Sequence, residues 1–176
     1  MIIKQTPIDG LKIIQTDLNE DERGYFSRVF CKNEFKQNNI NHNIVQCNIS
    51  HNNKAGTIRG MHYQKYPYEE TKIIKCTRGS IFDVAVDIRI NSETYLEWFA
   101  IELNAKSNLI FYIPEGFAHG YQTLENDTDV FYMTSEFYNP KFEGGIRWND
   151  PAVHIRWPLQ PSIISEKDKI HVRIEP

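Results

Sequence analysis

The sequence predicts an all-β fold of the sandwich or barrel type, and three features indicate it. Short runs rich in β-branched and aromatic residues dominate, clusters such as RINSET and ENDT separate them, and a helical period is almost absent. The predicted strands are residues 72–78, 80–89, 98–104, 109–114 and 129–138. Short strands at this spacing are typical of sandwiches and barrels.

Two further segments place polar residues beside these strands. Residues 57–64, TIRGMHYQ, form another strand-like run, which carries one imidazole and one guanidinium. In IPEGFAHG, a turn at Pro114 and Gly116 presents His119. The sequence therefore predicts two single histidines on two separate strands, which indicates a small-barrel pocket.

Helical signal is confined mainly to residues 31–38, where we expect Asn33 to cap a short helix that carries Phe35. From Trp148 onward the chain contains several prolines and should be irregular but packed on the body.

Alternation along the strands assigns side chains to faces. In residues 80–89, Asp83 lies on the face opposite Val84 and Val86, so we expect it to face a polar cavity. In residues 57–64, strict alternation separates Arg59 from His62. Both reach one cavity only if a bulge or a strand end lies near Gly60.

Size and charge exclude several classes of protein. The 176 residues fit one domain spanning 1–176, and a net charge of -3 lacks the basic excess of nucleic-acid binders. No stretch approaches the ~18 apolar residues of a membrane span. Three widely spaced cysteines without a CxxC motif favour a reduced, cytoplasmic protein.

The spacing Pro-x-Gly-x-x-His at residues 114–119 resembles the second motif of the cupin superfamily. Metal-binding cupins supply two histidines from the first motif, and here the second position is Gln64. A carboxamide is a poor ligand for zinc, iron or copper, so we expect no metal and no other cofactor. A cupin-type jelly roll (double-stranded β-helix) with a few short helices is the expected fold.

A pocket without metal suits proton abstraction beside a carbonyl, which needs a base, a group that stabilises an enolate oxygen, and an acid. His62, Lys72 and Tyr132 fit these three roles. A carboxylate behind the imidazole would fix its tautomer, and Asp168 in SEKD is the candidate.

Nearly the whole chain resembles the dTDP-4-dehydrorhamnose 3,5-epimerase family, a group of homodimeric, cofactor-independent cupins that act on nucleotide-linked 4-keto-6-deoxy sugars. The matching segments, all in the family's order, are DERGYF, VQCNIS, TIRGMHYQ, FDVAVDIR, IPEGFAHGY, FYMTSEFYNP, GIRWNDP and SEKD.

The resemblance implies a role for each matching position. His62 would be the base with Asp168 as its partner, Lys72 would stabilise the enolate oxygen, and Tyr132 would be the acid on the opposite face of the ring. The diphosphate would be bound by Arg23, Arg59 and His119. The nucleoside would be contacted, partly across the dimer interface, by Phe26, Gln46 and Asn48. The sugar site would be shaped by Asp83 and Tyr138.

Two departures from the family pattern leave the nucleotide open. Arg28 stands where an acidic residue is usual, and Cys47 replaces an aspartate. Because a guanidinium pairs well with guanine, a GDP-linked hexose or heptose remains an alternative to a dTDP-linked sugar. Other activities also remain open: a nucleotide-sugar 3,4-ketoisomerase, a metallo-cupin, and a non-catalytic sugar-binding cupin.

Overall fold

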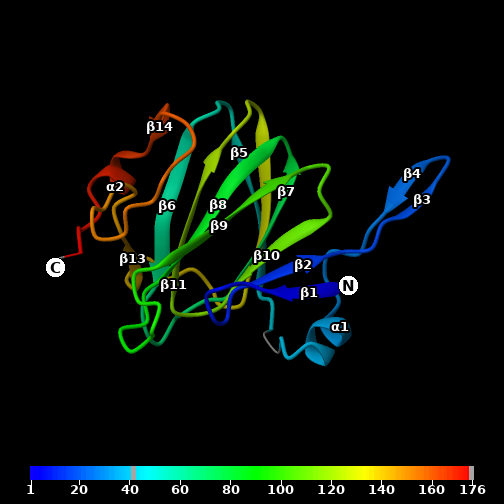
Figure 1. Cartoon of the computed structure of the whole chain (residues 1–176), viewed down its shortest axis with the longest axis horizontal. Helices are drawn as coiled ribbons and strands as arrows, with labels where there is room; N and C mark the ends of the chain where they lie inside the picture. The colour runs from blue at the N-terminus through cyan, green and yellow to red at the C-terminus, as the bar shows by residue number, and fades with distance from the viewer. Residues whose placement is uncertain (41–42, 175–176) are drawn as a thin grey trace.

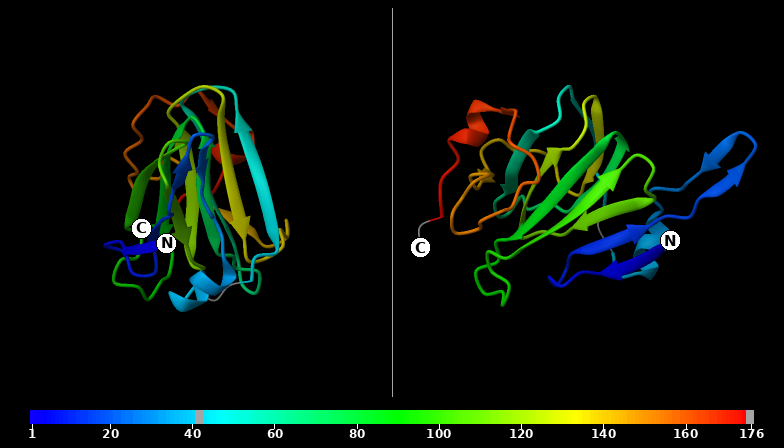
Figure 2. Two further views of the ribbon diagram at one scale, coloured as in Figure 1. Left: turned by 90° about the vertical axis from the view of Figure 1, so that its right-hand side faces the viewer. Right: turned by 45° about the horizontal axis from the view of Figure 1, so that its top comes forward.

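The computed structural model describes residues 1–40 and 43–174, and within these ranges the chain forms two large, mainly antiparallel sheets packed face to face (Figures 1 and 2). The predicted all-β jelly roll is confirmed.

One sheet has the order β1-β2-β10-β7-β12-β5. Its strands are β1 (Ile2–Gln5), β2 (Lys12–Gln15), β5 (Gln46–Asn52), β7 (Lys72–Arg78), β10 (Leu109–Ile113) and β12 (Thr128–Thr134). The other sheet has the order β13-β6-β11-β8-β9, with β14 pairing alongside β6. Its strands are β6 (Thr57–Gln64), β8 (Ser80–Asp87), β9 (Trp98–Asn104), β11 (Phe117–Thr123), β13 (Glu143–Gly145) and β14 (Ile163–Ile164).

The core lies between the two sheets, because each contributes one apolar face to it. Ile74 and Phe111 come from the first sheet, and Ile81 and Leu103 come from the second; all four side chains are fully or almost fully buried. Towards β5 and β6 the space between the sheets is lined by polar groups instead, and this is where the candidate site lies.

Two strands form a separate hairpin, β3 (Asn19–Asp21) and β4 (Gly24–Phe26), which projects away from the two sheets as an arm (Figure 1). Its aromatic residues Tyr25 and Phe26 are 61% and 63% exposed. A helix, α1 (Lys32–Gln37), follows the arm and buries Phe35, as predicted. The prediction that Asn33 caps it is wrong: Cys31 holds the N-cap position without a side-chain hydrogen bond, and Asn33 lies inside the first turn.

The region after Trp148 packs on the body as predicted, and it includes β14 and a short helix, α2 (Glu166–Lys169). Strand β14 pairs in parallel with the start of β6, with Ile163 opposite Thr57 and Ile164 opposite Ile58. This pairing carries α2 to the outer side of β6 (Figure 1). No helix in the described ranges is long and apolar enough to cross a membrane.

Candidate active site

A β-bulge in β6 brings Arg59 and His62 to one cavity, as the sequence required. Opposite β11, His62 pairs with His119 and Arg59 pairs with Tyr121, so β6 contains one extra residue in this interval. Gly60 accommodates the irregularity with a φ of +124°. Arg59 and His62 therefore line the same cavity, although they lie three residues apart on a strand.

The imidazole of His62 is fixed from behind by Asp168. Its Nε2 lies 2.7 Å from Oδ1 of Asp168, and the other carboxylate oxygen accepts a hydrogen bond from the backbone N–H of Gly60 at 3.3 Å. Ser165 begins α2 and its hydroxyl accepts from the backbone N–H of Asp168 at 3.1 Å. Because the Nε2–H group of His62 donates this hydrogen bond to Asp168, Nδ1 of His62 keeps the lone pair that a base needs.

Asp168 is suited to this partnership because it stays ionised. Burial alone would raise the pKa of this carboxyl. The hydrogen bond and charge of His62, together with the Gly60 N–H, outweigh burial and hold the pKa of Asp168 below its usual value.

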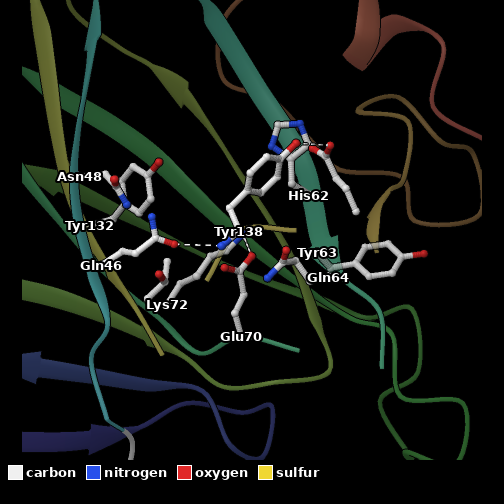
Figure 3. A pocket seen from close by; sticks show the side chains of 11 residues that line it. Gln46, Asn48, His62, Tyr63, Gln64, Glu70, Lys72, Tyr132 and Tyr138 are labelled. Carbon is white, nitrogen blue, oxygen red and sulfur yellow. Dashed lines mark hydrogen bonds and ion pairs between the residues drawn. The ribbon is translucent and has the colours of Figure 1, made fainter. Parts of the chain in front are cut away.

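Across the cavity stand Tyr132 and Lys72, on the neighbouring strands β12 and β7. An outer cavity of about 360 Å³ is lined by His62, Lys72 and Tyr132 together with residues of β5 (Figure 3). The same three residues also line the inner cavity of about 230 Å³, which contains Arg59. Burial raises the pKa of Tyr132, and the Glu70 carboxylate adds to the rise, so the phenol keeps its proton at neutral pH. The ammonium of Lys72 lies 3.1 Å from Glu70.

A second imidazole and carboxylate pair lies deeper in the site. Nε2 of His119 is 2.7 Å from Oδ1 of Asp83, whose side chain is completely buried. Burial raises the pKa of Asp83, and the charge and hydrogen bond of His119 oppose this only in part. Asp83 lies on the face of β8 that carries the core residues Ile81 and Ala85, opposite Val84 and Val86, and its carboxylate orients His119.

The remaining cavity residues predicted from the sequence come from β5 and from the loop after β12. Gln46 and Asn48 line the cavity, and the Gln46 side chain accepts a hydrogen bond from the backbone N–H of Tyr138 at 2.9 Å. The phenol of Tyr138 donates to Glu143 at 2.8 Å. These contacts hold Tyr138 in the lining of the cavity, where its side chain extends towards His62 (Figure 3).

Three predicted binding residues lie outside the cavity of their own chain. Arg23 and Phe26 are on the projecting arm, and Arg28 follows it. Arg23 pairs with Asp21, and Arg28 donates to Glu34 at 2.9 Å.

Gln64, at the position of a metal-ligand histidine in other cupins, has a structural role here. Its amide group donates to the carbonyls of Tyr68 and Phe137, and its oxygen accepts from the backbone N–H of Asn139 at 2.6 Å. The side chain therefore ties two loops to β6.

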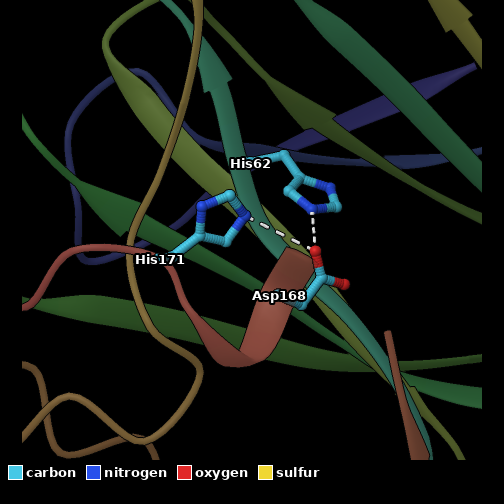
Figure 4. Close-up of side chains that lie close together, drawn as sticks. All are labelled: His62, Asp168 and His171. Atoms are coloured by element: carbon cyan, nitrogen blue, oxygen red, sulfur yellow. Dashed lines mark hydrogen bonds and ion pairs between the residues drawn. The ribbon is translucent and has the colours of Figure 1, made fainter. Parts of the chain in front are cut away.

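Sequence reasoning assigned no role to several residues that the structure brings to the site. Glu143 lines the cavity from the short, glycine-rich β13, where no periodic pattern marks it. Tyr121 donates its hydroxyl to Ser50 at 2.9 Å and lines the inner cavity with Arg59. His171 lies behind His62, and its position depends on how the tail folds back (Figure 4).

Comparison with known proteins connects this geometry to a family. A family model described as dTDP-4-dehydrorhamnose 3,5-epimerase matches residues 5–175. A protein of that name from Methanothermobacter thermautotrophicus is 42% identical over 168 residues, which cover 94% of this chain and 90% of the relative.

Two solved structures are similar to this chain over nearly its full length. A dTDP-4-dehydrorhamnose 3,5-epimerase from Bacillus anthracis, crystallised with TDP and PPi bound, has a TM-score of 0.96 at 36% identity and covers 98% of this chain and 99% of its own. A dTDP-6-deoxy-D-glucose-3,5-epimerase from Legionella pneumophila, in complex with dTDP-4-keto-L-rhamnose, has a TM-score of 0.91 at 37% identity, with coverages of 97% and 90%.

Proposed function

The chain belongs to the dTDP-4-dehydrorhamnose 3,5-epimerase family of isomerases, and we propose that it inverts C3 and C5 of a dTDP-linked 4-keto-6-deoxy sugar with His62 as base and Tyr132 as acid. The observation that carries the proposal is that one cavity is lined by a carboxylate-backed imidazole and, opposite it, by a protonated phenol.

The proposed reaction begins at a carbon beside the C4 ketone. Nδ1 of His62 takes the proton from that carbon, the C–H electrons form the enolate, and the negative charge passes to O4. The ammonium of Lys72 stabilises that oxygen, and Asp168 stabilises the imidazolium. Tyr132 then donates its proton to the opposite face of the carbon, so the configuration inverts. C3 and C5 both flank the ketone, so one base and one acid serve both carbons.

The cavity also suits the rest of a nucleotide sugar. Arg59 offers a guanidinium at the cavity, and His119 is held by Asp83, so both suit the diphosphate. Asp83 and Tyr138 would shape the sugar site, and Gln46 and Asn48 would contact the nucleoside.

Arg23 and Phe26 require a second copy of the chain, because their arm projects away from the two sheets and neither residue lines the cavity of its own chain (Figure 1). We therefore propose a homodimer in which each arm completes the partner's site. Its support is the exposed apolar surface of the arm and of the edge strand β5, where Ile49 is 72% exposed.

The nucleobase of the substrate is either thymine or guanine. The names of relatives and the TDP in a related structure favour thymine. Arg28 is paired with Glu34, which reduces its availability for a guanine edge. The thymidine nucleotide is accordingly the proposed one.

The decisive experiment offers dTDP- and GDP-linked 4-keto-6-deoxyhexoses and heptoses in deuterated water and follows C3 and C5 by NMR. The proposal expects deuterium at both carbons of the dTDP-hexose with inverted configuration, and His62→Asn should slow this about 10²- to 10⁴-fold. A product with its ketone at C3 would instead identify a 3,4-ketoisomerase. Absence of exchange across the panel would leave a sugar-binding protein, and equal exchange in His62→Asn would remove the imidazole from the mechanism.

A further inference from the structure

Behind the proposed base, three potential metal ligands converge from β6 and the tail. Oδ1 of Asp168 lies 2.7 Å from Nε2 of His62 and 3.4 Å from Nε2 of His171 (Figure 4). One potential ligand atom from each of the three residues lies within 4.8 Å of the other two. In the described part of the chain, no other group of histidine, cysteine or acidic side chains converges in this way.

His171 is the member of this cluster that the proposed reaction does not use. Its Nε2 is buried and has no hydrogen-bond partner among the described residues, although it faces the Asp168 carboxylate. Its ring meets that of His62 edge-on at 5.5 Å between centroids.

We propose that His62, Asp168 and His171 bind one Zn²⁺ ion. Two imidazole nitrogens and one carboxylate oxygen form a common zinc ligand set, with a water as the fourth ligand. Ligands about 2.0–2.1 Å from a tetrahedral ion lie about 3.3 Å apart. The separation of 3.4 Å between His171 and Asp168 already suits this geometry, and the contact of 2.7 Å between His62 and Asp168 must open slightly.

A cavity between β6 and the segment of β14 and α2 gives access to two of the three ligands. It has a volume of about 340 Å³, and its lining includes His62, Asp168 and Lys167. The Lys167 ammonium is held by Glu143, and this carboxylate offsets its charge near the cluster.

Binding of zinc would switch off the proposed base, and this consequence alone rests on the proposed function. Nε2 of His62 can coordinate zinc only after its proton has moved through solvent to Nδ1, the atom that faces the substrate. The ring stays neutral and carries its single proton on Nδ1. The ring has no free lone pair left to accept a proton from carbon, so zinc would act as an inhibitor.

The first test measures binding without any substrate. The full chain, stripped with chelator, is titrated with Zn²⁺ by calorimetry, and Co²⁺ is added separately to follow the visible d–d absorption of a tetrahedral site. The expected result is one Zn²⁺ per chain and intense cobalt bands. His171→Gln should weaken zinc at least tenfold, because loss even of a group that only supports a ligand costs about 10- to 100-fold.

His51→Asn is the matched control, because Nδ1 of His51 also lies close to a carboxylate, 2.6 Å from Asp129, but without a third ligand in the described chain. The control should bind zinc as the parent does. Absence of binding by the parent, or equal zinc affinity in His171→Gln, would overturn the proposal. The cobalt spectrum of the parent tests the same geometry even if a variant folds poorly.

The second test measures deuterium exchange with and without Zn²⁺, each variant being compared with its own zinc-free rate. Zinc should slow the parent and the His51→Asn control, and a chelator should restore them, whereas His171→Gln should respond only at tenfold higher zinc. Binding of zinc without inhibition of exchange would leave the metal site in place and would exclude His62 as the catalytic base. Absence of any exchange without zinc would count against the proposed function alone.

Discussion

Gly60→Ala should destabilise the protein strongly, because the β-bulge beside His62 leaves no room for a methyl group. Gly60 has a φ of +124°, and a Cβ there would lie 2.6 Å from the Cα of Gly120 and 2.8 Å from the carbonyl oxygen of His119. Both contacts are to backbone, so no side chain can rotate away. Relief requires β6 and β11 to separate at the point where His62 and His119 face each other.

The expected cost has two parts. A non-glycine residue in this backbone region costs about 1–3 kcal/mol, and forcing an extra carbon into a packed interior costs about 1–3 kcal/mol more. The sum is about 2–6 kcal/mol, and at about 2–4 °C per kcal/mol for a chain of this size, Tm should fall by roughly 4–24 °C.

Gly24→Ala separates these two parts. Gly24 has a similar φ of +121°, but nothing lies within 4 Å of the Cβ that the substitution would add. This control therefore carries only the backbone strain, in an exposed hairpin. Thermal unfolding by circular dichroism should show a clearly larger Tm loss for Gly60→Ala than for Gly24→Ala. Equal losses, or a Tm for Gly60→Ala within about 2 °C of the parent, would refute the argument from close packing.

Three further outcomes are expected. Tyr132→Phe should leave proton removal by the base intact, so deuterium should enter with retained configuration while epimer formation, followed by NMR, falls about 10²- to 10⁴-fold; undiminished inversion would exclude the phenol as the acid. Burial alone would raise the pKa of Asp87, but hydrogen bonds from its neighbours hold it well below the usual range. At a pH above about 3.9, the pKa of an unfolded aspartate, this depressed pKa stabilises the fold, and the stabilisation is lost as the pH falls towards the folded pKa. Urea unfolding should therefore show that Asp87→Asn loses less stability than the parent does from about pH 4 downward. Burial raises the pKa of the Cys76 thiol to about 11, so iodoacetamide at pH 8 should modify the exposed Cys47 well before it, as peptide mass mapping would reveal; equal rates would contradict the buried position.

The central strands were predictable because alternation and flanking turns fix them locally. Strands β7 and β9 have the predicted bounds, whereas β12 ends at Thr134 although the apolar pattern continued to Tyr138. The hydroxyl of Thr134 bonds the carbonyl of Glu136 at 3.1 Å, and the Glu136 carboxylate accepts from the Phe137 N–H at 2.7 Å. These local side-chain bonds compete with the strand, and a hydrophobic pattern does not reveal them.

The site was predictable to different degrees for different residues. The alternation rule identified the need for a bulge near Gly60, and the register between β6 and β11 contains it. His171 could not be inferred, because its approach to His62 depends on the parallel pairing of β14 with β6 across about a hundred residues. Local patterns carry no information on such a distant pairing.

The position of Asp168 along the chain has a consequence for biosynthesis. Every strand of the two sheets except β14 ends at or before Gly145, whereas Asp168 follows β14 in α2. At about 5–20 residues per second, a ribosome needs roughly one to five seconds to add the segment between β13 and this carboxylate. The strands of the two sheets other than β14 are thus all synthesised before Asp168, so the hydrogen bond that orients His62 is added to sheets whose other strands have already been made.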